Sequence, residues 1–239
     1  MGSWLAVDER GVATYTIDEA VTRNALSTRV LEDIKQTLTV LQQDSTVRVI
    51  VFTGAGVVFS SGADRAELGD PSTIEKTTQL LSSVLTLIDE SAVPVVCRVN
   101  GAAFGAGLAI VAAADIAVAV GEAFFGLPEV RFGLVAGPAA AACLGRIGQP
   151  AALDVLLTGR RFSAIEAQQM HLLARVVERE QLDAAVEALL ADLLLGDTAA
   201  IATTRRVVRR LASPTLAVRL RAFHATGELA ETEDTGHSR

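Results

Sequence analysis

The segment from residue 95 to residue 107 limits the fold of this chain more than any other part of it. An apolar strand at 95–99 is followed by an Asn-Gly turn, and then by a loop with glycines at 101, 105 and 107 that runs directly into an alanine-rich helix. Small residues at the start of a helix leave backbone N–H groups uncovered, and the positive end of the helix dipole adds to their attraction for a negative oxygen. The segment therefore predicts a strand–turn–helix unit whose turn can hold an anion.

A second unit of the same kind lies upstream. The apolar strand at 48–53 is broken by Gly54 and Gly56, and the small residues Gly62 and Ala63 follow before a stretch with helical character. Two such turns can aim two backbone N–H groups at one oxygen, forming an oxyanion hole in which each donor contributes about 3–4 kcal/mol. Two other readings remain open. The loop is not a complete dinucleotide fingerprint, because it lacks the G-x-G-x-x-G spacing, and the glycines also suit close strand–helix packing.

One acidic residue, Glu129, follows these turns in a Gly-Leu-Pro-Glu sequence. An anion-holding turn with a single carboxylate nearby is suited to enolate chemistry, in which a base removes a proton and the turn stabilises the charge on oxygen. The alternative is an ordinary surface turn residue after Pro128. The pattern thus makes Glu129 the candidate base.

Other polar residues have simpler explanations. Asp64 is predicted to cap the helical stretch that follows it, and Asp115 to be a hydrogen-bonded structural acid at a helix-to-strand corner. Glu67 and Glu122 remain open as acids that a loop would bring to the site. His171 is expected to occupy a left-handed turn at a helix end. The three histidines show no ligand spacing, and no metal site is predicted.

Charge and hydropathy exclude several classes of function. The net charge is −7 with a pI near 5.0, which argues against nucleic-acid binding. Apolar runs are interrupted before the ~20 residues needed to span a bilayer, so no membrane association is predicted. Cys97 and Cys143 suit buried free thiols in a reducing compartment. Without a basic region and apolar core at the N-terminus, a cytoplasmic location is expected.

Periodicity predicts the remaining elements. A hairpin is expected from strands at 4–7 and 12–17, and helices at 28–44 and 71–90. Pro150 is expected in the first turn of a further helix. From residue 192 onward two helices are expected. In them an apolar stripe and an arginine face oppose each other; the stripe comprises Val207, Val208, Leu211, Leu216 and Leu220, and the arginine face comprises Arg205, Arg206, Arg209 and Arg210.

Taken together, the motifs resemble the crotonase (enoyl-CoA hydratase/isomerase) superfamily. They are Phe59–Asp64, Asn100-Gly101, Gly105–Gly107 and Phe125–Glu129, and similarity on both flanks extends the resemblance over residues 5 to 236. The resemblance implies an α/β fold: a crotonase-like spiral of ββα units over residues 1–191 and a C-terminal helical oligomerisation segment over 192–239. It also implies assembly as a homotrimer or a hexamer made of two trimers.

The resemblance further implies an acyl-CoA thioester substrate, with no cofactor beyond the coenzyme A that is part of it. Glu129 would be catalytic, and the N–H groups of Ala63 and Ala106 would hold the thioester oxygen. Residues matching the coenzyme A contacts are Arg23, Ser61, Ala63, Asp64 and Arg65. The acyl pocket is expected to be lined by Phe104, Phe132 and the 80–87 face of the helix at 71–90.

The sequence departs from family hydratases at Ala109, where the first of their two glutamates falls. Adding water to a double bond requires two carboxylates around one water molecule, whereas moving a double bond requires one base. The resemblance therefore favours enoyl-CoA isomerisation. A low-efficiency hydratase, another crotonase reaction such as decarboxylation or hydrolysis, and a catalytically impaired acyl-CoA-binding subunit remain as alternatives.

Overall fold

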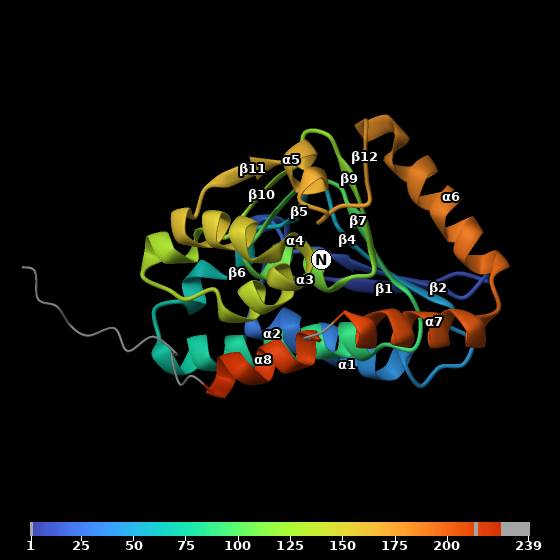
Figure 1. The fold of residues 1–239 in the computed structure, drawn as a ribbon, viewed down its shortest axis with the longest axis horizontal. Coiled ribbons are helices and arrows are strands. Elements are labelled where there is room, and N and C mark those ends of the chain that lie inside the picture. The colour runs from blue at the N-terminus through green and yellow to red at the C-terminus, as the bar shows by residue number, and fades with distance from the viewer. Residues whose placement is uncertain (1, 213–214, 226–239) are drawn as a thin grey trace, which may run out of the picture.

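A computed structural model describes residues 2–212 and 215–225 and shows one motif repeated four times: a strand of a large sheet, one or two short strands and a helix (Figure 1). The first unit comprises β2 (Val12–Ile17), β3 (Ala25–Leu26) and α1 (Thr28–Leu41). The second comprises β4 (Val49–Gly54), β5 (Val58–Ser60), β6 (Gly62–Ala63) and α2 (Pro71–Glu90). The third comprises β7 (Val95–Val99), β8 (Ala102–Phe104) and α3 (Ala106–Ala113). The fourth comprises β9 (Ile116–Val120), β10 (Phe124–Gly126) and α4 (Gly137–Thr158).

The large sheet has six strands in the order β1-β2-β4-β7-β9-β12, in which β1 is Trp4–Val7 and β12 is Arg175–Val177. Every neighbouring pair is parallel except β1 and β2, which form the predicted hairpin. All six residues of β4 are buried, as expected for a central strand of a parallel sheet covered on both faces. The predicted spiral of ββα units is therefore confirmed.

The short strands lie beside this sheet and bring the turns together. A four-stranded sheet has the order β11-β10-β8-β5, with β11 at Arg161–Ser163, and β3 pairs separately with β6. Successive turns of the spiral therefore end next to one another: β5 pairs with β8, and β8 pairs with β10. Short 3-10 helices follow several of these turns, namely η1 (Ala20–Thr22), η2 (Arg65–Glu67), η3 (Pro128–Phe132) and η4 (Arg179–Gln181).

Local sequence explains where the helices of the spiral begin and end. The side chain of Ser27 accepts a hydrogen bond from the Val30 N–H and caps α1, and Asp70 caps α2 in the same way at Thr73. The helix predicted at 28–44 ends at Leu41. All eight residues of α3 are buried, because it lies inside the spiral and packs against α2 and α4.

α4 is interrupted at Gly148, whose φ of 73° and ψ of 164° are not helical. Pro150 follows immediately, where its missing N–H costs little because the second part of the helix is beginning. The prediction of a helix starting at Pro150 is thus confirmed, and a kink at Gly148 separates the two helical parts of α4.

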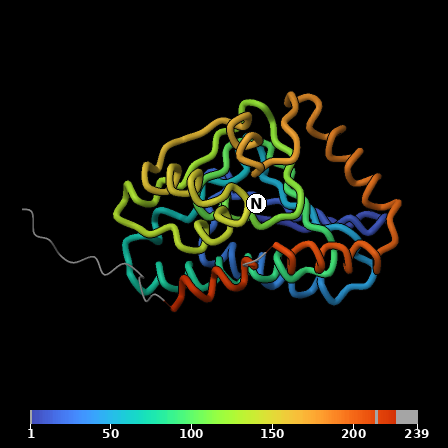
Figure 2. The backbone as a smooth tube through the Cα atoms, viewed as in Figure 1, coloured from blue at the N-terminus to red at the C-terminus, as the bar shows by residue number. Residues whose placement is uncertain are grey.

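The C-terminal part comprises α5 (Ala164–Gln169), α6 (Leu182–Leu195), α7 (Thr198–Leu211) and α8 (Leu216–Ala225). Figure 2 shows α6 (orange) along one end of the molecule, while α7 and α8 (orange-red to red) run along its lower edge. α8 packs against α2 and α4. The predicted division between residues 191 and 192 falls within α6, and residues 226–239 lie outside the described part of the chain.

The prediction that four arginines share one face of α7 is wrong. Arg205 and Arg209 turn toward the core and form ion pairs with Asp115, whereas Arg206 and Arg210 are exposed. Val207, Val208 and Leu211 are exposed as well. The carboxylate of Asp115 accounts for this orientation, because two guanidinium groups reach it from one side of the helix.

Candidate active site

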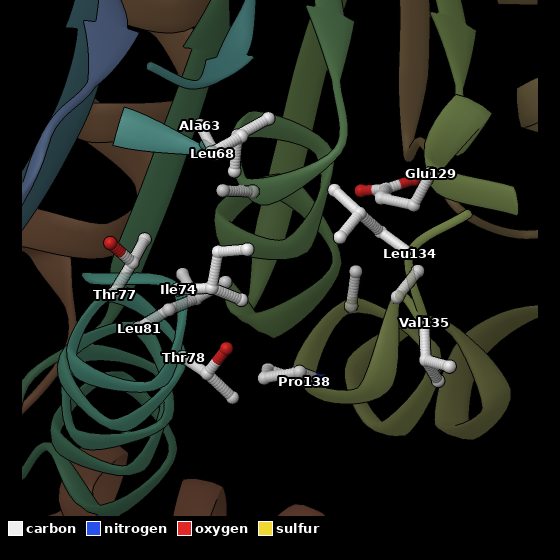
Figure 3. Close-up of a pocket in the computed structure, with 13 residues that line it drawn as sticks. Ala63, Leu68, Ile74, Thr77, Thr78, Leu81, Glu129, Leu134, Val135 and Pro138 are labelled. Atoms are coloured by element: carbon white, nitrogen blue, oxygen red, sulfur yellow. The ribbon is translucent and has the colours of Figure 1, made fainter. Parts of the chain in front are cut away.

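A cavity of about 80 Å³ lies where β6, α2, α3, η3 and the start of α4 meet (Figure 3). Ala63, Ala106 and Glu129 all line it. The rest of the lining is mostly apolar and comes from α2, from the loop before α4 and from the first turn of α4. The structure thus brings together the three residues that the sequence proposed for catalysis.

Ala106 reaches the cavity because Gly105 turns the chain from β8 into α3. Gly105 has a φ of 50°, and Ala106 is the first residue of α3, so its N–H has no acceptor within the helix. A Cβ on Gly107 would lie 2.6 Å from the Cβ of Ser60. Glycine is therefore required there for α3 to approach the turn of the second unit.

Ala63 belongs to the turn that packs against this one. Gly62 has a φ of 96°, and a Cβ there would lie 2.8 Å from the carbonyl oxygen of Phe104. Two buried asparagines hold the adjoining loop: the side-chain N–H groups of Asn24 bond to the carbonyls of Ala55 and Val58 at 3.0 and 2.8 Å. Asn100 accepts from the N–H of Gly54 at 3.1 Å. These contacts fix the two turns against each other.

Glu129 enters the cavity from η3, the short helix that follows β10 (Figure 3). Its Oε1 lies 2.7 Å from the position that a Cβ on Gly105 would occupy. Its Oε2 is buried and has no hydrogen-bond partner among the described residues. Burial disfavours the charged carboxylate and raises the pKa of Glu129 to about 7.

The other acids considered from the sequence are engaged elsewhere. Glu67 accepts hydrogen bonds from the N–H and hydroxyl of Thr28, at 2.8 and 3.1 Å. Glu122 pairs with Arg179 on the surface. Ala109, the position of the missing glutamate, is completely buried. Among the residues that the structure describes, Glu129 is the one charged side chain in the cavity lining.

The candidate coenzyme A contacts lie together on the loops beside β6. The N–H of Ser61 donates to the carbonyl of Arg23 at 3.0 Å, and the Ser61 hydroxyl donates to the carbonyl of Thr22 at 2.8 Å. Asp64 caps η2 by accepting from the Ala66 N–H, which confirms the capping role predicted for it. The guanidinium of Arg65 lies 5.0 Å from the centre of the Phe132 ring.

The acyl-pocket prediction was wrong for the two phenylalanines. The Phe104 ring packs beside Gly126 and under Arg161, and Phe132 is largely exposed beneath Arg65. Within the predicted 80–87 face of α2, Leu81 does line the cavity. The other α2 residues of the lining were not predicted from the sequence. They are Ile74, Thr77 and Thr78. Their i, i+3, i+4, i+7 spacing with Leu81 is a signal that marks one face of a helix.

Several structural roles predicted from sequence are confirmed. Asp115 accepts from the Val95 N–H at 2.8 Å and pairs with two arginines, and His171 has a φ of 64°. Cys97 and Cys143 are buried free thiols, and burial raises the pKa of Cys143 to about 12.

Within residues 2–212 and 215–225, no cluster of side chains suits a metal ion, and no helix has the length and hydropathy to span a membrane.

Comparison with known proteins identifies the family to which the chain belongs. The model of the enoyl-CoA hydratase/isomerase family matches residues 8–236. A probable enoyl-CoA hydratase, echA12 of Mycobacterium bovis, is 36% identical over 182 residues, which cover 72% of this chain and 64% of that protein. The human peroxisomal bifunctional enzyme is 39% identical over 164 residues, covering 68% of this chain and 22% of its own length.

Solved structures agree with the sequence comparison. An enoyl-CoA hydratase from Mycobacterium smegmatis superposes with a TM-score of 0.85 at 29% identity, covering 94% of this chain and 90% of that one. The human enoyl-CoA hydratase domain-containing protein 3 also gives 0.85, at 25% identity, covering 95% and 90%. The chain therefore belongs to the enoyl-CoA hydratase/isomerase family, within the crotonase superfamily.

Proposed function

We propose that this protein moves the double bond of an enoyl-CoA thioester, with Glu129 carrying a proton between C2 and C4. The observation that supports this most directly is a single carboxylate, without a hydrogen-bond partner among the described residues, in an apolar cavity between two glycine turns. The N–H groups of Ala63 and Ala106 would donate hydrogen bonds to the thioester carbonyl oxygen. Coenzyme A enters as part of the substrate, and no separate cofactor is proposed.

In this reaction the Glu129 carboxylate removes a proton from C2 of a 3-enoyl thioester. The electron pair of the broken C–H bond delocalises onto the carbonyl oxygen and forms a dienolate, which the two N–H donors stabilise. Glu129, now protonated, delivers the same proton to C4, and the double bond settles between C2 and C3. A pKa of about 7 suits both steps, because a group that must accept and then donate a proton works best with a pKa near the working pH.

Hydration is the second candidate, and the names of several relatives favour it. Against it stands the methyl group of Ala109, which can neither hold nor deprotonate a water molecule. Glu67 and Glu122 are held by Thr28 and Arg179, so neither replaces the missing acid. The presence of one carboxylate and not two at the cavity therefore favours isomerisation.

We also propose that the chain assembles as a trimer or as a pair of trimers, and that the loops with Arg23, Ser61, Asp64 and Arg65 contact coenzyme A. The exposed apolar residues of α7 support the first proposal: Val207, Val208 and Leu211 have exposed fractions of 47%, 59% and 80%. The hydrogen bonds that join the Ser61 and Arg23 loops support the second.

A paired spectrophotometric assay tests the reaction. We expect 3-hexenoyl-CoA to yield conjugated 2-enoyl thioester, while crotonyl-CoA at the same concentration is lost slowly. The Ala109→Glu variant should gain crotonyl-CoA hydration. Fast hydration by the wild-type protein would overturn the isomerase assignment. Thioester binding without turnover of either substrate would instead support another enolate reaction or a binding subunit.

A further inference from the structure

The hydroxyl of Ser60, the last residue of β5, joins two turns of the spiral. The side chain is completely buried. Its hydroxyl donates to the carbonyl of Asn24 at 2.7 Å and accepts from the N–H of Gly62 at 3.2 Å. Because a backbone carbonyl can only accept, the hydroxyl proton points to Asn24 and a lone pair of the oxygen faces Gly62. Both hydrogen bonds of this hydroxyl are therefore assigned.

Asn24 is a rigid anchor for the first of these bonds. It is buried, and its side-chain oxygen accepts from the N–H of Glu19 at 3.0 Å. Its side-chain nitrogen donates to the carbonyls of Ala55 and Val58. Since these three bonds hold Asn24 in place, its carbonyl sets the direction in which the Ser60 hydroxyl points.

Gly62 requires a restraint because it directly precedes Ala63, the first proposed oxyanion donor. Its φ of 96° is a conformation from which glycine rotates more freely than other residues. Rotation of the Gly62 backbone would turn the peptide group that carries the Ala63 N–H. The hydrogen bond to Ser60 opposes this rotation, and so does the carbonyl oxygen of Phe104, 2.8 Å from the position of a Cβ on Gly62.

The second proposed donor meets the same side chain. Gly107 follows Ala106 in α3, and a Cβ on Gly107 would lie 2.6 Å from the Cβ of Ser60 and 2.8 Å from its Oγ. The backbone of α3 therefore rests directly on Ser60. The residue before one donor and the residue after the other both contact one buried side chain, which thus determines how far apart the two donors lie.

We propose that Ser60 is a positioning residue that fixes the spacing and orientation of the Ala63 and Ala106 N–H groups. It acts through Gly62 and Gly107 and does not touch the thioester. The inference rests on the proposed thioester function, but it concerns the oxyanion hole and not the reaction that follows. Since donors stabilise the oxyanion only when they are held in place, Ser60→Ala should lower kcat on 3-hexenoyl-CoA about tenfold, with KM within about twofold.

The stretching frequency of the bound thioester carbonyl tests this role without turnover, because hydrogen bonds to the oxygen weaken the C=O bond. Hexanoyl-CoA labelled with carbon-13 at C1 is saturated, so its band can be measured by infrared spectroscopy at equilibrium. We expect the wild-type protein to lower the frequency below its value in water, and Ser60→Ala to lose about half of that shift. Ser60→Cys, whose thiol is a weaker donor and acceptor at the same place, should give an intermediate shift.

Ser91→Ala is the matched control, because Ser91 is also buried and makes the same pair of bonds at the end of α2, outside the cavity lining. Its hydroxyl donates to the carbonyl of Val93 at 2.8 Å and accepts from the Val93 N–H at 3.2 Å. Both alanine variants should lower the free energy of unfolding to a similar extent in urea. Only Ser60→Ala should change the carbonyl frequency and kcat.

Two kinds of failure are distinguishable. If the wild-type protein lowers the frequency and Ser60→Ala keeps both that shift and kcat, or if Ser91→Ala changes them equally, the positioning role of Ser60 is wrong. If the wild-type protein does not bind hexanoyl-CoA, or binds it with the frequency found in water, the proposed thioester function fails instead.

Discussion

Two carboxylates inside this protein have opposite surroundings. Asp115, at the start of β9, accepts from the Val95 N–H at 2.8 Å and forms ion pairs with Arg205 and Arg209, both at 2.7 Å. Glu129, in η3, faces an apolar cavity, and its Oε2 has no partner in the described part of the chain. A backbone N–H and two guanidinium groups offset the charge of the Asp115 carboxylate. The described residues provide no such partner for Oε2 of Glu129.

The difference separates a structural acid from a candidate catalytic one. Removing a carboxylate from water is costly, and ion pairs with good geometry offset that cost at Asp115. At Glu129 the cost remains, and it appears as a pKa raised to about 7. Strongly shifted acids in clefts cluster at functional sites, which supports Glu129 as the candidate catalytic acid.

The largest expected effect comes from replacing the uncompensated acid. Glu129→Gln keeps the shape of the side chain but cannot accept a proton, so turnover of 3-hexenoyl-CoA should fall by about 10³-fold. Binding of the thioester should change little, and the free energy of unfolding should change little at pH 5 but rise at pH 8, where the buried carboxylate of the wild type is charged. Activity above a tenth of the wild-type value, measured on protein free of wild-type contamination, would show that another group is the base.

Replacing the compensated acid should affect stability instead. Asp115→Asn removes the carboxylate that Arg205 and Arg209 share, while Arg209 keeps its ion pair with Asp89, and should lower the free energy of unfolding by about 3 kcal/mol in a urea titration. Glu122→Gln is the control, since its ion pair with Arg179 is exposed and should contribute under ~1 kcal/mol. A variant at 115 as stable as this control would mean that the arginine cluster does not depend on the carboxylate.

The pH dependence should distinguish the two acids further. Below a pKa of about 7 Glu129 is protonated and cannot act as a base, so kcat/KM should fall about tenfold per pH unit on the acid side and level off above pH 7. Because this pKa is higher in the folded chain than the ordinary 4.5, Glu129 favours the folded state at low pH, and that contribution is lost as pH rises from about 4.5 through 7.

Glu129→Gln should abolish this component of the stability profile, and unfolding titrations at pH 5 and pH 8 measure it. A wild-type rate that stays constant from pH 5 to pH 8 would contradict the raised pKa.

Local sequence signals predicted much of the spiral. The bounds of α2 and β7 agree with those predicted, because Asp70 and Pro71 mark the start of the helix and an Asn-Gly turn ends the strand. The turns with Ala63 and Ala106 were found because glycines mark close approaches of backbone. Each of these signals lies within a few residues of the feature that it marks.

The features that were missed depend on distant partners. Arg205 turns inward because Asp115, 90 residues earlier in the chain, lies beneath α7. Phe132 is exposed, and its ring contacts Arg65 from another turn of the spiral instead of lining the cavity. The start of α4 lines the cavity because of the way the turns of the spiral stack on one another. The spacing of residues within a single helix or strand does not reveal that stacking.

The smallest expected effect concerns Arg65, the arginine that lies closest in sequence to Ala63. Arg65 follows Ala63 and rests 5.0 Å from the ring of Phe132, three residues after Glu129, so it joins the two loops that frame the cavity. A cation–π contact of this exposed kind contributes about 0.5–1 kcal/mol. In a chain of net charge −7, a guanidinium here would also attract the phosphates of coenzyme A.

Arg65→Met should raise KM roughly threefold at low salt, with kcat within about twofold. Phe132→Leu removes the ring and keeps the charge, so it should leave KM unchanged. If Phe132→Leu raised KM as much as Arg65→Met, the contact between the loops and not the charge would be what binds the substrate.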